Sequence, residues 1–262
     1  MRNFRAALWV EAIKARRSKV PWLTAIGFLF VPLVGGLFMV ILKDPEAARQ
    51  MGLISTKAQL TAGSADWPSY FKFLMQAIAV GGAIIFAILP AWVFGREFSD
   101  HTAKEVLALP TSRGAIVAAK FVVVAGWAFS VALISFAIGL VVGKLVVIPG
   151  WSIELLRSAS VNILGSALMA IALLPFVALW ASVGRGYLPA LGWAILTVML
   201  AQIAAAIGWG DWFPWSVPAL FSGVAGPRGE LIGLHSYVVV VVACAIGLAS
   251  TFLWWQMADQ AR

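Results

Sequence analysis

The chain has 262 residues, of which 62% are hydrophobic and only 11% are charged. A soluble domain carries about 25% charged residues, so this composition excludes a water-exposed globular protein and predicts a chain surrounded by lipid. The net charge of +8 does not indicate nucleic-acid binding, because the basic residues lie between apolar segments rather than on one protein face. The one cysteine, Cys244, can form no internal disulfide.

Residues 1–20 carry six basic residues and one acidic residue. Apolar residues recur there at helical spacing, which predicts a basic amphipathic helix lying among anionic lipid headgroups. We expect this membrane-interface helix to use Phe4, Leu8, Trp9, Glu11, Arg16 and Arg17. A signal peptide is the alternative, but the following apolar run is too long for one and has no A-x-A site before Lys43.

Six apolar segments of about 20 residues, the length that crosses a bilayer, follow along the chain. They cover about residues 22–41, 71–94, 121–142, 161–181, 187–207 and 237–255. The predicted fold is an all-α integral membrane protein with six transmembrane helices in one domain over residues 1–262. We predict kinks at Pro90 and Pro175, and close helix packing at Gly139 and Gly143, which have G-x-x-x-G spacing. A short helix is expected around residues 46–61.

Residues 95–120, between the second and third predicted spans, are polar and carry charges of both signs. Thr102 and Glu105 fit a capping box that begins a short helix, and Pro110 ends it. One face of this helix is polar and the other apolar, formed by His101, Lys104 and Glu105 and by Ala103, Val106 and Leu107. Thr111 or Ser112 then caps the next helix. A solvated loop is the alternative.

Aromatic residues gather in residues 208–236, before the last span. They predict a re-entrant or interfacial helix pair, with Trp212, Phe213, Pro214 and Trp215 as candidates for an outer gate. The alternative is an aromatic belt at the membrane interface.

The distribution of Lys and Arg predicts that both termini are cytoplasmic. With the N-terminus inside, twelve of these residues lie inside and seven outside, as the positive-inside rule requires. The polar segment 95–120 is then cytoplasmic as well.

The run of residues 92–121 resembles the loop between the second and third spans of ABC-2 type ABC transporter permeases. The residues that carry the resemblance are Gly95, Arg96, Glu97, Thr102, Val106, Leu107, Leu109, Pro110, Ser112, Arg113 and Lys120. Residues 11–14 and 212–215 also resemble that family. The resemblance implies that the loop is a coupling helix that docks on an ATP-binding subunit. The coupling residues that it implies are Arg96, Glu97, Asp100, Thr102, Lys104, Glu105, Val106, Leu107 and Arg113.

The resemblance further implies the membrane subunit of a bacterial exporter in the cytoplasmic (inner) membrane. Its expected partners are two copies of an ATP-binding cassette subunit, a second copy of this permease or a related one, and membrane lipid. The chain has no G-x-x-x-x-G-K-[ST] motif, so we expect no enzyme activity, no catalytic residue, no metal and no bound cofactor, with ATP and Mg²⁺ held by the partner subunits. The expected cargo is hydrophobic or amphipathic: an antibiotic, a peptide or a lipid-like molecule.

No Asp, Glu, Lys, Arg or His lies within the core of any of the six predicted spans. Because charges within spans usually mark ion pathways or active sites, this argues against an ion-coupled transporter and against a membrane enzyme acting on lipid. The hypothesis left open beside the exporter is a non-transporting scaffold that docks a soluble partner through the same loop.

Overall fold

The computed structural model describes residues 2–50, 52, 64–102, 105, 110–224 and 232–257. Over these residues the chain forms helices and no strand. Six helical stretches there are long and apolar enough to cross a membrane: Lys19–Lys43, Trp67–Ser99, Arg113–Leu145, Ile153–Val183, Tyr187–Ala206 and Leu234–Met257. The prediction of an all-α membrane protein with six spans is therefore confirmed.

The first two helices, α1 (Arg2–Arg17) and α2 (Lys19–Lys43), meet at Ser18. The Ser18 hydroxyl accepts a hydrogen bond from the Val20 amide at 3.2 Å and caps α2. Helix α1 packs against the later helix α8 (Arg113–Leu145), so it is an integral part of the bundle.

The face of α1 that packs against the protein was not predicted from the sequence. The sequence predicted a membrane-interface helix with apolar residues that include Leu8 and Trp9, and this placement in the membrane stays a prediction. In the structure the face turned toward the protein consists of Ala7, Glu11 and Ala15, whereas Trp9 is 70% exposed. Small residues allow α1 to lie close to α8, and the bulky aromatic side chain points outward.

The second span lies at the centre of the bundle. It consists of α5 (Trp67–Gln76), a π-helical turn η1 (Ala77–Gly81) and α6 (Gly82–Ser99). Asp66 caps α5 by accepting a hydrogen bond from the Ser69 amide at 2.8 Å. Pro90 lies inside α6, which continues past it without ending.

The fourth span is divided at Leu173 into α9 (Ile153–Ala172) and α10 (Leu174–Val183). Pro175, in the first turn of α10, accounts for the break that the sequence predicted. The remaining helices are α3 (Pro45–Gln50), α11 (Tyr187–Ala206), the short α12 (Val217–Phe221) and α14 (Leu234–Met257).

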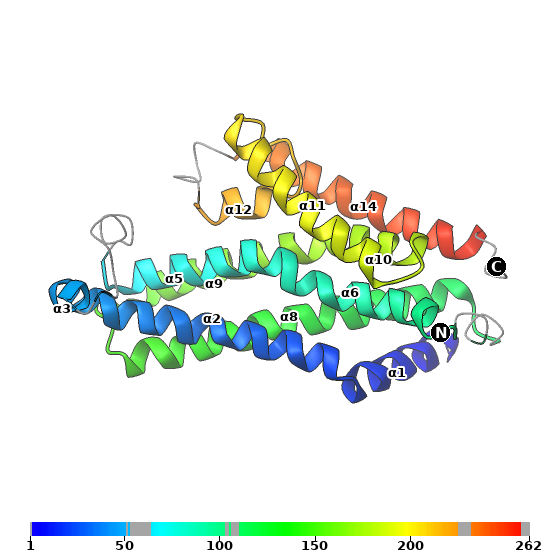
Figure 1. The fold of residues 1–262 in the computed structure, drawn as a ribbon, viewed down its shortest axis with the longest axis horizontal. Helices are drawn as coiled ribbons and strands as arrows, with labels where there is room; N and C mark the ends of the chain where they lie inside the picture. The colour runs from blue at the N-terminus through cyan, green and yellow to red at the C-terminus, as the bar shows by residue number, and fades with distance from the viewer. Residues whose placement is uncertain are drawn as a thin grey trace.

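The long helices run side by side, and both chain ends lie at one end of the bundle (Figure 1). Helix α6 packs against α2 on one side and against α10 and α11 on the other. Helix α10 also packs against α14. The end of α6 and the start of α8 lie at this same end (Figure 1).

Hydrogen bonds from neighbouring helices support α2 where Pro32 interrupts its backbone ladder. Pro32 has no N–H, and the carbonyl of Phe28, four residues earlier, accepts a hydrogen bond from Ser135 Oγ of α8 at 3.2 Å instead. Tyr70 Oη of α5 donates to the Pro32 carbonyl at 3.0 Å. Ser135 thus packs helices together, as expected for polar residues within spans.

Three helices extend well beyond the predicted spans. Helix α6 continues to Ser99, α8 begins at Arg113, and α9 begins at Ile153. The polar residues at these ends continue the helical backbone hydrogen bonds beyond the apolar segments from which the spans were predicted. Two charged residues expected in a polar segment, Glu97 and Lys120, consequently belong to long membrane-spanning helices. The predicted helix at 46–61 corresponds to α3 in its first part, and most of the remainder lies outside the described residues.

Candidate functional site: a buried charge cluster joining three helices

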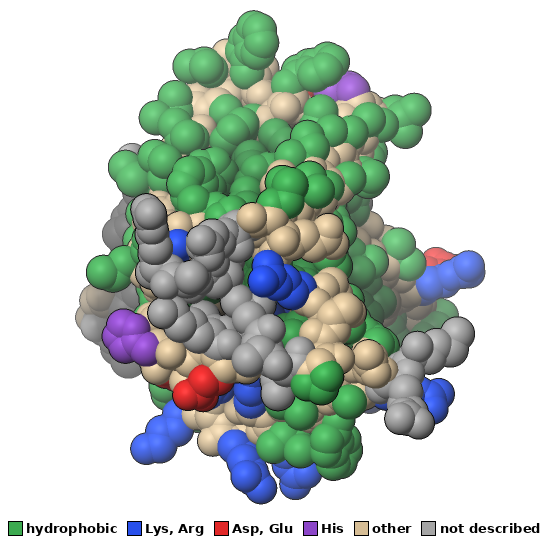
Figure 2. Space-filling view, turned by 90° about the vertical axis from the view of Figure 1, so that its right-hand side faces the viewer, with side chains coloured by type: hydrophobic (Ala, Val, Ile, Leu, Met, Phe, Trp, Pro, Cys, Tyr) green, Lys and Arg blue, Asp and Glu red, His purple; other side chains and the backbone are tan. Residues whose placement is uncertain are grey.

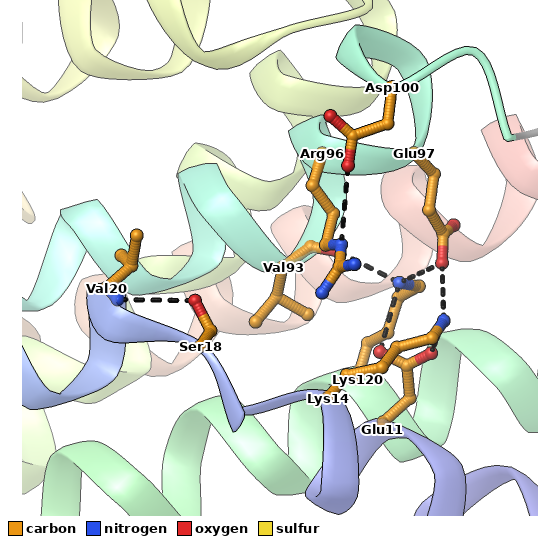
Figure 3. Close-up of polar contacts among 9 residues, drawn as sticks. All are labelled: Glu11, Lys14, Ser18, Val20, Val93, Arg96, Glu97, Asp100 and Lys120. Carbon is orange, nitrogen blue, oxygen red and sulfur yellow. Dashed lines mark hydrogen bonds and ion pairs between the residues drawn. The ribbon is translucent and has the colours of Figure 1, made fainter. Parts of the chain in front are cut away.

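Four charged side chains meet inside the protein where α1, α6 and α8 come together (Figure 3). They are Glu11 and Lys14 from α1, Glu97 from α6 and Lys120 from α8, and we call them the charge cluster. Glu11 and Lys14 are three residues apart and so share one helix face. The cluster lies at the end of the bundle that carries the connection between α6 and α8.

Each ammonium group of the cluster contacts both carboxylates. Lys14 Nζ lies 2.6 Å from Glu11 Oε1 and 3.1 Å from Glu97 Oε1. Lys120 Nζ lies 3.3 Å from Glu11 Oε2 and 2.9 Å from Glu97 Oε1. Two positive and two negative charges therefore balance in a closed ring, the arrangement that lets buried charges be tolerated.

Lys120 is the most deeply placed member of the cluster. Its side chain is 0% exposed, and Nζ also donates to the Val93 carbonyl of α6 at 2.9 Å. Val93 and Glu97 are one turn apart, so Lys120 contacts α6 through both backbone and side chain. Glu97 Oε2 has no hydrogen-bond partner among the described residues, so both cations share the other oxygen of this carboxylate.

Lys14 is the member of the cluster that reaches the surface, with 25% of its side chain exposed. Burial lowers the pKa of Lys14, but the carboxylates of Glu11 and Glu97 outweigh this effect and raise its pKa above the usual value. The lysine therefore stays protonated throughout the neutral range.

The end of α6 is also held on its other side. A Cβ atom on Gly95 would lie 3.0 Å from the carbonyl carbon of Gly186, in the turn between α10 and α11. Only glycine permits this close approach of the two backbones. Helix α6 is thus fixed between the charge cluster and the turn at 184–186.

Three of the predicted coupling residues, Arg96, Asp100 and Arg113, form contacts within the chain outside the charge cluster. Arg96 lies 3.9 Å from Asp100 and stacks on the Trp92 ring, 4.9 Å from its centroid. Arg113 Nη1 donates to the carbonyls of Trp255 and Gln256 at 3.3 and 3.2 Å, tying the start of α8 to the end of α14.

The remaining predicted coupling residues have mixed placements. Glu97 is buried and lies in the charge cluster, so it is not available for direct contact with a partner. Thr102 is half-buried and Glu105 exposed. Lys104, Val106 and Leu107 lie outside the described residues, so the capping box and the amphipathic segment stay predictions. Ser112 caps α8, since its hydroxyl accepts a hydrogen bond from the Ala115 amide at 3.3 Å.

The predicted interface residues of α1 divide between the two sides of the helix. Glu11 is buried in the cluster, Phe4 and Leu8 are half-buried, and Trp9, Arg16 and Arg17 are exposed. Sequence reasoning named Glu11 and Glu97 for separate roles and did not bring the four charges together. The available signal was Lys120, a single cation within the apolar run AIVAAKFVVV, which needs a buried carboxylate partner.

The predicted outer-gate residues lie at the opposite end of the bundle. Trp212 is exposed, and its ring stacks on His235 with centroids 4.4 Å apart. Trp215 packs against Phe176 and Trp193, with ring centroids 5.2 and 5.6 Å apart. Phe213 packs on Trp215, and Pro214 is half-buried. The re-entrant pair stays a prediction, because residues 225–231 are outside the described residues.

The fold and the cluster together define a multi-pass helical membrane protein in which buried ion pairs hold together the end of α6, the start of α8 and α1. The model of the ABC-2 family transporter proteins matches residues 7–201, and the chain belongs to that family. It is also 25% identical over 182 residues to the bacitracin transport permease protein BCRB of Bacillus licheniformis, covering 68% of this chain and 85% of that protein.

Family membership makes the chain a transporter permease and implies an ATP-binding subunit as its partner. The resemblance inferred from residues 92–121 is thereby confirmed at the level of the family.

Proposed function

We propose that this chain is the membrane-spanning permease subunit of an ATP-driven exporter in the bacterial cytoplasmic membrane. Two copies of a separate ATP-binding subunit hold ATP and Mg²⁺, and a second copy of this permease or a related one completes the transport pathway. Both chain termini face the cytoplasm, in agreement with the distribution of Lys and Arg.

The observation that carries this proposal is the charge cluster at the base of the connection between α6 and α8. The cluster links both helices that flank this connection to α1. A force applied to the connection by ATP-binding subunits would therefore move α1, α6 and α8 as one unit. Contact of α6 with α10 and α11 would carry the movement across the bundle.

The proposed substrate is hydrophobic or amphipathic, and an antibiotic of this kind is our first choice. The relative from Bacillus licheniformis is a bacitracin transport permease, which supports a bulky amphipathic cargo. The apolar character of all six spans agrees with such a cargo. The exposed aromatic residues near Trp212 are proposed to lie at the outer exit of the pathway.

In the proposed mechanism the segment 103–109 docks on the ATP-binding subunit. Val106 and Leu107 fill an apolar notch of that subunit, while Asp100, Lys104, Glu105 and Arg113 form polar contacts with it. Asp100 and Arg113 are positioned for this role by their contacts with Arg96 and with the end of α14. Glu97 acts indirectly by holding α6 in the charge cluster.

The first test is purification of the tagged chain from its native membranes and identification of the proteins that accompany it. An ATP-binding cassette protein in stoichiometric amount is expected. A soluble partner of another kind, or none in several detergents, contradicts the proposal and favours the scaffold hypothesis.

The second test replaces Leu107 by Asp and measures transport and ATP hydrolysis in proteoliposomes that contain the permease and its ATP-binding subunit. We expect a fall in transport of about tenfold or more, because a charged side chain is excluded from an apolar notch. Ala12→Asp, on the exposed side of α1, is the matched control and should retain transport. Equal transport by Leu107→Asp and the control would refute the docking role of this segment.

A further inference from the structure

A groove of about 300 Å³ lies beside the charge cluster, between α1 and the start of α8. Ala6, Ala7 and Val10 of α1 form one wall, and Ile116 of α8 with the turn at 110–111 forms the other. This volume is at the lower end of the range for small-molecule sites, about 300–1,000 Å³. The groove is thus large enough for part of an alkyl chain and too small for a whole lipid.

The end of the groove nearest the cluster is lined by Glu11 and Lys14. Each oxygen of the Glu11 carboxylate contacts an ammonium group of the cluster. Lys14 has three N–H donors, of which the two carboxylates engage two. Because Lys14 is 25% exposed and Glu11 only 6%, the groove presents a positive charge at this end.

The exposed surface of α1 combines apolar and basic side chains. Trp9 and Val10 are exposed, as are Arg5, Arg16 and Arg17. Glu11 is the one acidic residue of α1, and it is buried. Figure 2 looks onto this end of the molecule and shows hydrophobic and basic side chains side by side along its lower edge, where α1 runs.

A basic helix with exposed aromatic and aliphatic residues lies at the headgroup level of a membrane, where anionic lipids attract Lys and Arg. A groove at that depth, apolar along its walls and positive at one end, is complementary to a molecule with an alkyl chain and an anionic headgroup. Arg17 lies one turn beyond Lys14 on the same helix face and adds a second positive charge.

We propose that this groove is a binding site for an anionic phospholipid of the surrounding leaflet. Part of one acyl chain lies between Val10 and Ile116, and the headgroup phosphate is held by Lys14 and Arg17. The bound lipid bridges α1 and α8 alongside the charge cluster and so stabilises the contact between these helices. This site belongs to the chain itself and does not depend on an ATP-binding partner.

The test uses the purified, delipidated full chain in detergent, to which phosphatidylglycerol or phosphatidylcholine with identical acyl chains is added. Native mass spectrometry measures the lipid bound, and the thermal unfolding midpoint measures its effect on stability. We expect phosphatidylglycerol to bind about tenfold more tightly than phosphatidylcholine and to raise the midpoint.

Ala6→Trp fills the groove without changing a member of the cluster, and we expect it to weaken phosphatidylglycerol binding about tenfold. Ala12→Trp, on the exposed side of α1 and away from the groove lining, is the matched control. Thr111→Trp fills the groove from the opposite wall and replaces Ala6→Trp if that variant fails to accumulate.

Three results would overturn the proposal. Unchanged phosphatidylglycerol binding by both groove-filling variants would show that the lipid binds elsewhere. Equal binding of phosphatidylglycerol and phosphatidylcholine would show that Lys14 and Arg17 do not select an anionic headgroup. Retained lipid binding with loss of the co-purified ATP-binding protein would assign the groove to that partner instead.

Discussion

Lys120 is a fully buried charged residue, so the structure must replace the hydration that its ammonium group loses. A fully buried ammonium group loses its hydration, and burial is tolerated only where carboxylates and hydrogen-bond acceptors replace the lost water. Lys120 finds Glu11, Glu97 and the Val93 carbonyl within 3.3 Å. It also lies 5.7 Å and 6.0 Å from the ring centroids of Phe94 and Trp255, at distances where aromatic faces attract cations.

Replacing Lys120 by Met should therefore destabilise the protein by about 3–5 kcal/mol, because the two buried carboxylates then share only Lys14 as a cation. Lys144→Met, at an exposed position, should change stability by no more than about 0.5 kcal/mol. The double variant Lys120→Met with Glu97→Gln should lose less than the sum of its single variants, because the remaining charges balance. Unfolding free energies measured in detergent test this. Equal losses for Lys120→Met and Lys144→Met would mean that the cluster adds no stability.

Titration of the Asp66 carboxyl group at the start of α5 should make the stability of the protein depend on pH. Burial raises the pKa of this carboxyl group, but hydrogen bonds from the Ser64 hydroxyl and the Ser69 amide outweigh this, and the pKa lies below its usual value of 3.8. The carboxylate therefore adds stability at pH values above 3.8, and this contribution is lost as the pH falls through the pKa of the folded state.

We expect Asp66→Ala to lower stability by about 0.5–1 kcal/mol at neutral pH, with the difference from the unmodified protein shrinking below pH 3.8. Ser152 is a matched control, because its hydroxyl caps α9 at the Leu155 amide and does not titrate. The deficit of Ser152→Ala should stay constant over the same range. Thermal unfolding of both variants between pH 3 and 7 provides the measurement, and parallel pH curves would refute the role assigned to the Asp66 carboxylate.

At the scale of elements, small residues decide how closely the helices approach. A Cβ atom on Gly139 would lie 2.6 Å from Leu74, and one on Gly143 would lie 2.3 Å from the Trp67 ring. The close packing that the sequence predicted at the G-x-x-x-G spacing is confirmed, and the structure identifies α5 as the helix that packs there.

Gly143→Ala should lower stability by about 1–3 kcal/mol, because the added methyl group overlaps the rigid Trp67 ring and forces α5 and α8 apart. Gly126→Ala lies on the same helix with no atom within 4 Å of the added carbon. It should be neutral or stabilising by up to about 1 kcal/mol, since alanine favours the helix. Unfolding of both variants in detergent measures the difference. Similar effects of the two substitutions would contradict the close contact.

The irregular elements concentrate in the second and fourth spans. The π-helical turn η1 interrupts the second span, and the break at Leu173 interrupts the fourth. These two spans pack together, since α9 contacts both α5 and η1. Pro175 allowed the irregularity in the fourth span to be predicted from the sequence. The turn at 77–81 has the sequence AIAVG, in which nothing distinguishes a π-helix from an α-helix.

At the scale of the whole molecule, hydropathy was sufficient to predict the spans and their order. Each of the six spans contains a mainly apolar stretch of about 20 residues. Such a stretch can be recognised from neighbouring residues in the sequence alone. The ends of the helices were harder to predict, because Glu97 and Lys120 are polar in sequence but helical and buried in the structure. Their polarity is compensated by residues that are far away in the chain.

The charge cluster could not be deduced from local patterns. Lys14 and Glu97 are separated by 83 positions, and Glu11 and Lys120 by 109. The packing of α1 and α6 against α8 brings these residues together. The packing of α1 on α8 also turns Ala7, Glu11 and Ala15 inward.

The charge balance of the cluster also has a consequence for the order of biosynthesis. The ribosome delivers Glu11, Lys14 and Glu97 before it makes Lys120. Until then the chain supplies only two carboxylates and one ammonium group to the cluster, so its charges can balance only after α8 has been made and packs against α1 and α6. We therefore expect α1, α6 and α8 to reach their final packing together, after synthesis of the third span.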